Sequence, residues 1–186
     1  MSIDSIKRQI PDYAKDLRIN IGNVLDPERA PDGMSAEQVF GTALATAIAS
    51  RNQELLASIE GEVTPKLGEE WLNAAKAAAA IMGMNNVYYR FVHLASNEEY
   101  GSMPAGLRMS VIGRPGIDKA DFELMSLAVS AVNGCGLCID SHEKVLKQAG
   151  VGSDVVQHAV RIASVMHAVA TVFDAEGLSG GVKAAA

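Results

Sequence analysis

The residues in this chain with the clearest chemical potential lie in one short stretch, NGCGLCIDSHEKVLKQAG, at positions 133–150. It contains both cysteines of the chain, Cys135 and Cys138, and His142 follows the second by four positions. Two thiols at this spacing can close a disulfide where the backbone brings their Cα atoms within range. In a reducing compartment such a pair more often binds metal or performs redox chemistry than serves as a permanent cross-link. The stretch therefore indicates a metal site, a redox dithiol, or two thiols that merely pack.

These side chains are expected to share one face of a helix. Residues three and four positions apart lie on the same side of a helix, so Cys135, Cys138 and His142 form one stripe with the thiols at its amino-terminal end. The partial positive charge and unpaired amides at that end favour a thiolate over a thiol. His142 lies one turn after Cys138, where it can accept the thiol proton or hold it in an ion pair.

An acidic residue on the preceding predicted helix is a candidate partner for this histidine. Glu123 can approach His142 across the break at Asn133-Gly134 and orient its ring, as a carboxylate does in a proton relay. The alternative is a surface role, because acids near a helix start often compensate the helix dipole.

Several other chemistries fit the cysteine stretch less well. A c-type haem requires a histidine directly after the second cysteine, where this chain has Ile139. A structural zinc site requires four ligands, and the two thiols with His142 leave one missing. A thioredoxin-type site expects a βαβ context. The other histidines and the methionines at core-like spacing are expected to be surface or packing residues: His93, His158, His167, Met82, Met84, Met125 and Met166.

The composition favours a helical protein around this stretch. The 186 residues are 48% hydrophobic but only 5% aromatic, and alanine is abundant, which favours close helix packing. A net charge of −6 without any basic run argues against a nucleic-acid interface. No secretory signal is expected at the N-terminus, and the most apolar run, 74–84, is too short to span a bilayer. These features predict an all-α, cytoplasmic protein that spans no membrane.

Apolar residues recur at helical spacing through nearly the whole chain. A capping box at 35–38 predicts the start of a long helix, and Thr64-Pro65 is expected to cap the next one. The stretch 108–120 is expected to be a linker, and the tail 177–186 to be frayed. The predicted helices cover about 3–10, 11–17, 36–57, 73–94, 118–132, 135–150 and 154–174.

A weak internal repeat runs through these helices. A shift of 82 positions aligns FGTALATAIASRNQELLASIE, from Phe40, with FELMSLAVSAVNGCGLCIDSH, from Phe122. This indicates a single domain over 1–186 with two similar halves, about 36–95 without redox thiols and about 118–174 with the C-x-x-C pair. Chance similarity between two alanine-rich helices is the alternative.

The sequence resembles the AhpD family of alkyl hydroperoxide reductases, within the carboxymuconolactone decarboxylase-like superfamily. The resemblance runs over nearly the whole chain and is carried by IMGMNNVYYR and by the E-x11-C-x2-C-x3-H spacing of Glu123, Cys135, Cys138 and His142. It implies an all-helical fold of two similar halves that assembles as a homotrimer. It also implies a weak peroxidase that acts as the thiol reductant of a peroxiredoxin.

The same resemblance implies a role for each site residue. Cys138 is expected to meet the peroxide, and Cys135 to resolve the product and exchange with partners. His142 and Glu123 are expected to form the proton relay that activates Cys138. The family often has a histidine directly before the second cysteine, and this chain has Leu137, which leaves a proton-handling role at that position in doubt.

The function expected from these roles is an antioxidant thiol oxidoreductase that reduces organic hydroperoxides without a bound cofactor. Its electrons are expected to come from a dihydrolipoyl group on a lipoylated 2-oxoacid dehydrogenase acyltransferase, recharged by dihydrolipoamide dehydrogenase. They would pass to a peroxiredoxin of the AhpC type. Because the thiols are expected to face partly inward, this relay is expected to outweigh direct attack on bulky peroxides. Two alternatives stay open, a small-lactone decarboxylase and a non-catalytic helical assembly protein.

Overall fold

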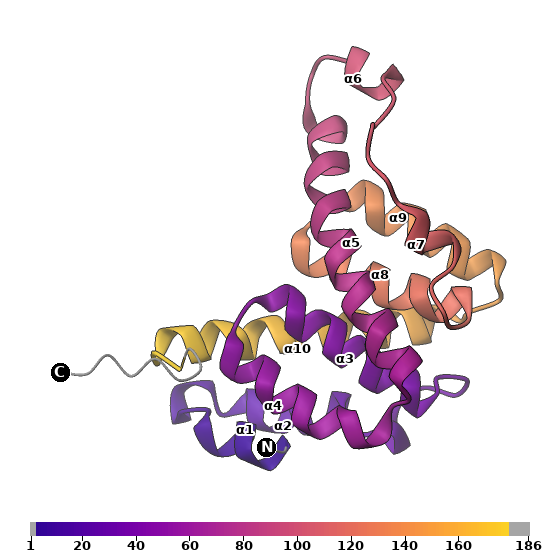
Figure 1. Cartoon of the computed structure of the whole chain (residues 1–186). Coiled ribbons are helices and arrows are strands. Elements are labelled where there is room, and N and C mark those ends of the chain that lie inside the picture. The colour runs from indigo at the N-terminus through magenta and orange to yellow at the C-terminus, as the bar shows by residue number, and fades with distance from the viewer. Residues whose placement is uncertain (1–2, 179–186) are drawn as a thin grey trace.

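The structure is a computed structural model that describes residues 3–178, and the predicted all-α class is confirmed. No strand occurs in this range, and α-helices with three short 3-10 helices account for its regular structure (Figure 1). The α-helices are α1 (Ile3–Gln9), α2 (Asp16–Val24), α3 (Ala36–Ser50), α4 (Gln53–Val63), α5 (Glu69–Leu94), α6 (Glu99–Ser102), α7 (Ser110–Gly113), α8 (Lys119–Asn133), α9 (Gly136–Gln148) and α10 (Ser153–Ala175).

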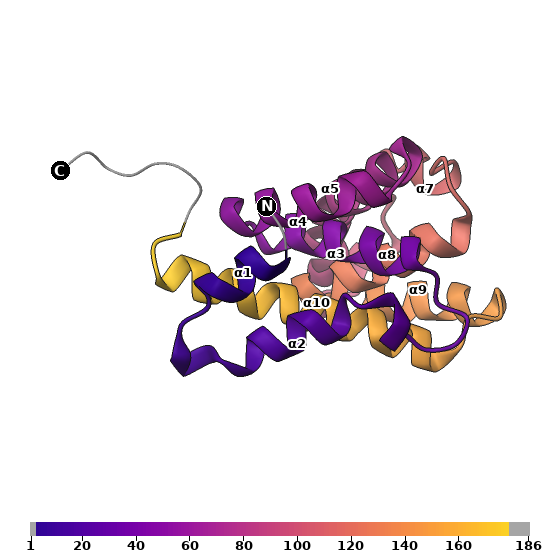
Figure 2. The same ribbon diagram turned by 90° about the horizontal axis from the view of Figure 1, so that it is seen from below.

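The centre of the molecule is formed by α3, α5, α8 and α10. Helices α3 and α8 each contact the other three. Most of α3 is buried, as expected for a helix that is apolar nearly all round. Gly41 allows the close approach of another helix there, because a Cβ at this position would lie 3.0 Å from the Trp71 ring. Helix α9 packs against α8 and α5, and α2 lies along α10 on the opposite side of the molecule (Figure 2).

One helix of the described residues, α10, is long and apolar enough to cross a membrane by length and composition. Of its most apolar window, 56% is buried inside the molecule. Its contacts with α3, α8 and α2 give it the position of a core helix.

The prediction of one long helix over 36–57 is wrong. The capping box at its start is present, since Gln38 N donates to Ser35 Oγ at 3.1 Å and Ser35 N donates to Gln38 Oε1 at 2.9 Å. The chain leaves the helix at Arg51, whose φ of 63° is left-handed. Asn52 then caps a new helix by accepting a hydrogen bond from Leu55 N at 2.8 Å. A left-handed residue followed by a capping side chain ends one helix and starts the next.

Arg51→Gly is expected to stabilise the protein. A left-handed backbone strains any residue with a Cβ, and the Arg51 side chain is exposed, so little packing is lost. We expect a gain of about 0.5–1 kcal/mol in the free energy of unfolding, measured by denaturant titration. Gly134 has a similar φ of 69°, so Gly134→Ala is the matched control and should lower stability by a similar amount. Equal stabilities for Arg51→Gly and the wild type would contradict this account.

Two other predicted boundaries near prolines are also wrong. The segment after Pro11 starts as a 3-10 turn, Asp12–Ala14, and α2 begins only at Asp16. The segment Thr64–Lys66 is likewise a short 3-10 helix, and α5 begins at Glu69. Pro11 precedes its turn in an extended conformation, with ψ at 169°. Pro65 lies inside its turn, which ends at the extended Leu67.

The boundaries around the cysteine stretch were predicted correctly. Asp118 caps α8 by accepting a hydrogen bond from Ala120 N at 2.8 Å, and Gly134 ends that helix. The expected linker before Asp118 contains the single turn α7. Most of the expected frayed tail, residues 179–186, lies outside the described residues.

The helix caps recur at a constant interval of 83 positions, close to the shift of 82 that aligns the two sequence segments. Left-handed Arg51 corresponds to left-handed Gly134. Asn52 corresponds to Cys135, and each is the N-cap of the helix that follows and accepts a hydrogen bond with its side chain. The division into two similar halves stays a prediction.

Candidate active site

The cysteine stretch begins at a tight junction between α8 and α9. After Asn133 the chain turns through Gly134, whose positive φ suits a residue without a Cβ. Gly134 N donates to Ala131 O and Cys135 N donates to Ser130 O, which satisfies two carbonyls at the end of α8. Cys135 then takes the N-cap position of α9, and Cys138 N donates to its Sγ at 3.3 Å.

A chain of hydrogen bonds fixes the end of α8 to α5. Asn86 Nδ2 donates to Ser130 Oγ at 2.9 Å, and Asn133 Nδ2 donates to Asn86 Oδ1 at 2.9 Å. Arg90 Nη1 donates to Asn133 O at 2.5 Å. These bonds, referred to below as the α5–α8 anchor, hold in place the residue that precedes the junction.

The two cysteines form a disulfide in this structure, with their Cα atoms 5.3 Å apart. Their environments differ. Cys135 is completely buried, whereas Cys138 is 6% exposed and lines a cavity. A molecule that enters the cavity therefore meets Cys138 first.

Glu123 and His142 lie together, as the sequence interpretation of a relay requires. Glu123 projects from α8 and His142 from α9, and Glu123 Oε2 lies 2.5 Å from His142 Nδ1. Both residues are buried, Glu123 at 4% exposed and His142 at 8%. The alternative of a surface role for Glu123 is wrong. A buried carboxylate that accepts a hydrogen bond from an imidazole fixes the orientation of the ring.

The other ring nitrogen of His142 faces a methionine. His142 Nε2 lies 3.2 Å from Met82 Sδ, and Met82 is 1% exposed. Met82 packs in the core as expected, but it also lines the cavity and contacts the imidazole, which the sequence interpretation missed. Among the described residues, 3–178, no hydrogen bond joins His142 to the sulfur of Cys135 or of Cys138 in this disulfide form.

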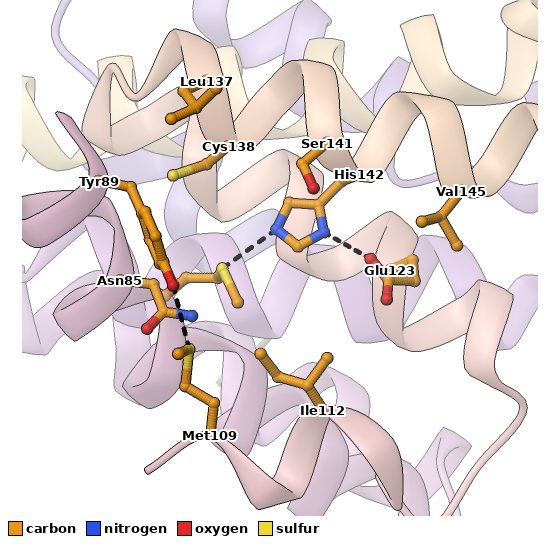
Figure 3. A pocket seen from close by; sticks show the side chains of 11 residues that line it. Asn85, Tyr89, Met109, Ile112, Glu123, Leu137, Cys138, Ser141, His142 and Val145 are labelled. Carbon is orange, nitrogen blue, oxygen red and sulfur yellow. Dashed lines mark hydrogen bonds and ion pairs between the residues drawn. The ribbon is translucent and has the colours of Figure 1, made fainter. Parts of the chain in front are cut away.

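The cavity beside Cys138 has a volume of about 430 Å³ and a largely apolar wall (Figure 3). Its polar side chains come mainly from α5, α8 and α9. Figure 3 shows His142 next to Glu123, with Cys138 on the same helix as His142 and Asn85 and Tyr89 on the other side. The apolar part of the wall is formed by Met82, Met109, Ile112, Leu137 and Val145.

Sequence reasoning missed further residues that line this cavity, in addition to Met82. Asn85 and Tyr89 lie on α5, inside the IMGMNNVYYR motif that identified the family resemblance but suggested no role for any residue. Met109 and Ile112 come from the stretch expected to be a linker. Only the packing of α5 and α7 next to α8 and α9 brings them to the thiols.

The three remaining histidines lie apart from this cavity. His158 is buried, and its Nε2 lies 3.1 Å from Val24 O, so it is a satisfied core residue. His93 and His167 are exposed. Among the residues that the structure describes, no group of three or more His, Cys, Asp or Glu side chains could hold a metal ion.

Comparison with known proteins gives consistent matches. The Carboxymuconolactone decarboxylase family profile matches residues 98–178, the part that contains all four predicted site residues. A protein named alkyl hydroperoxide reductase AhpD from Rhodopseudomonas palustris is 56% identical over 184 residues, which cover 99% of each chain. Similarly named proteins from Streptomyces coelicolor and Rhizorhabdus wittichii are 54% and 57% identical, over 96% and 92% of this chain and 98% and 97% of their own.

Proposed function

This chain belongs to the alkyl hydroperoxide reductase AhpD family of the carboxymuconolactone decarboxylase-like superfamily, and we propose that it reduces organic hydroperoxides through its Cys135–Cys138 pair. The observation that carries the proposal is the position of this pair, beside an apolar cavity and on the same helix as a histidine paired with a buried carboxylate.

The oxidising half of the cycle begins with the reduced protein. The Cys138 thiolate attacks the terminal oxygen of the hydroperoxide, the O–O bond breaks, and the alkoxide leaves and takes up a proton to become an alcohol. Cys138 is then a sulfenic acid. The Cys135 thiol attacks that sulfur, releasing water and closing the disulfide. The accessibility of Cys138 from the cavity supports its assignment as the thiol that meets the peroxide.

The reducing half restores both thiols by exchange. A dithiol such as a dihydrolipoyl group attacks the disulfide, forms a mixed disulfide, and then closes its own ring as the second protein thiol leaves. Two electrons and two protons pass to the protein. The external reductant would be a lipoylated 2-oxoacid dehydrogenase acyltransferase recharged by dihydrolipoamide dehydrogenase, and the electrons would pass on to an AhpC-type peroxiredoxin. We further propose that the protein works in the cytoplasm as a homotrimer, with no bound cofactor.

The Glu123–His142 pair is proposed to handle the protons of both halves. The carboxylate holds the imidazole through Nδ1 and stabilises it when it is protonated, so that Nε2 can exchange a proton on the side of the cavity. Because Nε2 contacts Met82 in the disulfide form, transfer to Cys138 requires the imidazole to turn from Met82 or the Cys138 sulfur to move after reduction.

A coupled assay tests this proposal. NADH oxidation is followed in a mixture of the protein, dihydrolipoamide dehydrogenase, lipoamide and an organic hydroperoxide, with and without the matching peroxiredoxin. We expect NADH consumption that depends on this protein and rises when the peroxiredoxin is added. Absence of NADH oxidation in both mixtures, with an active dehydrogenase control, would contradict the proposal.

The two alternatives make different predictions. A small-lactone decarboxylase should turn over a muconolactone-type acid and be indifferent to alkylation of its thiols. In a non-catalytic assembly protein the reduced thiols should survive peroxide treatment unchanged. Mass spectrometry of the reduced protein distinguishes this last case, because redox cycling removes two hydrogen atoms from the peptide that contains Cys135 and Cys138.

A further inference from the structure

One polar side chain in the wall of the cavity has unused hydrogen-bonding capacity. Asn85 is 4% exposed, lines the cavity, and its Oδ1 has no hydrogen-bond partner in the described structure. A buried carbonyl without a partner destabilises the fold, so such a group in a native protein calls for an explanation. Figure 3 shows Asn85 on the side of the cavity opposite Glu123, with its amide nitrogen toward the cavity and its oxygen turned away.

The adjacent residue shows that this is not a general property of asparagines in α5. Asn86 is 1% exposed and belongs to the α5–α8 anchor, where it donates to Ser130 and accepts from Asn133. The chain therefore has two neighbouring buried asparagines. One is satisfied by the fold, and the other lines the cavity and has a buried carbonyl oxygen without a partner.

The other buried polar groups around the cavity already have partners. Glu123 and His142 are bonded to each other, and the second nitrogen of His142 contacts Met82. The hydroxyl of Tyr89 lies 3.9 Å from Met109 Sδ. Ser141, the remaining polar side chain of the wall, belongs to an exposed residue. The Asn85 amide is thus the buried group best placed to bind a polar atom that enters the apolar cavity.

We propose that Asn85 binds the hydroperoxide group of the substrate, an inference that rests on the proposed function. A primary amide offers an acceptor and a donor side by side. When the amide turns about its Cβ–Cγ bond, its carbonyl oxygen reaches the cavity and accepts a hydrogen bond from the terminal O–H of the hydroperoxide. Its N–H donates to the inner oxygen, which carries the organic group. A hydroperoxide matches both, whereas an alcohol has only one oxygen to offer.

The reaction strengthens one of these two hydrogen bonds. When the Cys138 thiolate takes the terminal oxygen, the inner oxygen leaves with the electron pair of the O–O bond and becomes an alkoxide. A neutral N–H···O bond then becomes charge-assisted, so Asn85 binds the transition state more tightly than the substrate. The donor is fixed in an apolar cavity, where such stabilisation is large. The alkoxide finally takes its proton from the Glu123–His142 pair.

Single-turnover oxidation of the reduced, full-length protein tests the role of Asn85. The variant Asn85→Leu keeps the approximate size of the side chain and removes the amide. With cumene hydroperoxide we expect its oxidation rate to fall on the order of 100-fold. With 4,4′-dithiodipyridine, a disulfide that has no O–O bond to recognise, its rate should equal that of the wild type. Its thermal stability should be unchanged or higher, because an unsatisfied buried carbonyl is removed.

Two further variants serve as control and backup. Asn86→Ala, which breaks the α5–α8 anchor, should lower thermal stability and leave the ratio of the two oxidation rates unchanged. If Asn85→Leu does not fold, Asn85→Ala removes the same amide without adding bulk.

The results separate this inference from the proposed function. A wild-type protein that reacts with 4,4′-dithiodipyridine but not with cumene hydroperoxide would contradict the proposed function. A wild type that reacts with both, together with an Asn85 variant whose peroxide rate is unchanged, would overturn only the role of Asn85. An Asn85 variant whose oxidation rates fall by the same factor with both reagents would also overturn only the role of Asn85.

Discussion

Cys138→Ser is expected to abolish hydroperoxide reduction, lowering kcat by about 10⁴-fold or more, as loss of a covalent nucleophile does in other enzymes. Cys138 is the sulfur that opens to the cavity, and serine cannot form a thiolate. Cys135→Ser should also stop turnover, but at a different stage. The Cys138 thiolate can still react once, and its sulfenic acid then has no thiol to condense with.

A sulfenic-acid trap followed by mass spectrometry measures this difference. After one addition of hydroperoxide, a dimedone adduct is expected on Cys138 in the Cys135→Ser protein and none on Cys135 in the Cys138→Ser protein. The reverse pattern would exchange the roles of the two cysteines. Steady-state turnover by either variant at the wild-type rate would rule out a mechanism through the disulfide.

The second large effect concerns the Glu123–His142 pair. His142→Phe is expected to slow peroxide oxidation of Cys138 by about 10²-fold or more, the usual contribution of a general acid or base. It also leaves the Glu123 carboxylate buried without its partner, which should lower the free energy of unfolding by about 3 kcal/mol. Combining it with Glu123→Leu should restore much of that stability but none of the activity.

Two measurements on these variants test the pairing and the proton role separately. A double-mutant cycle on the free energy of unfolding gives the coupling between the two side chains, and we expect it to be large because they are in direct contact. The pH profile of Cys138 alkylation in the reduced protein should move to higher pH in His142→Phe. If that profile matched the wild type, the proposed relay to Cys138 would be wrong.

The helix bounds around the site and the helix face that carries its side chains could be predicted from the sequence, because capping residues and helical periodicity determine them. Asp118 and Gly134 are residue types that begin and end helices, so the bounds of α8 followed from them. Helical periodicity placed Cys138 and His142 on one face. The pairing of Glu123 with His142 needed the turn at Gly134, and the sequence contains the glycine that allows it.

The predictions that were missing or wrong concern features that depend mainly on packing between segments distant in the chain. Nothing near Met82 or Asn85 in the sequence indicates that α5 passes beside His142, which lies 60 residues after Met82. The break at Arg51 was missed because arginine is a good helix former, and Asn52, a residue type that often caps helices, was not interpreted as a helix start. A short turn such as α7 has too few residues to show a periodic pattern.

The α5–α8 anchor has a consequence for how a second protein could reach Cys135. That cysteine is fully enclosed, and the chain immediately before it is tethered by Arg90 and Asn86. Backbone movement that exposes Cys135 must therefore occur on its C-terminal side, where Gly136 and Leu137 are exposed. Thiol-disulfide exchange between Cys135 and a partner protein would then begin with unwinding of the first turn of α9. The other helices would keep their positions.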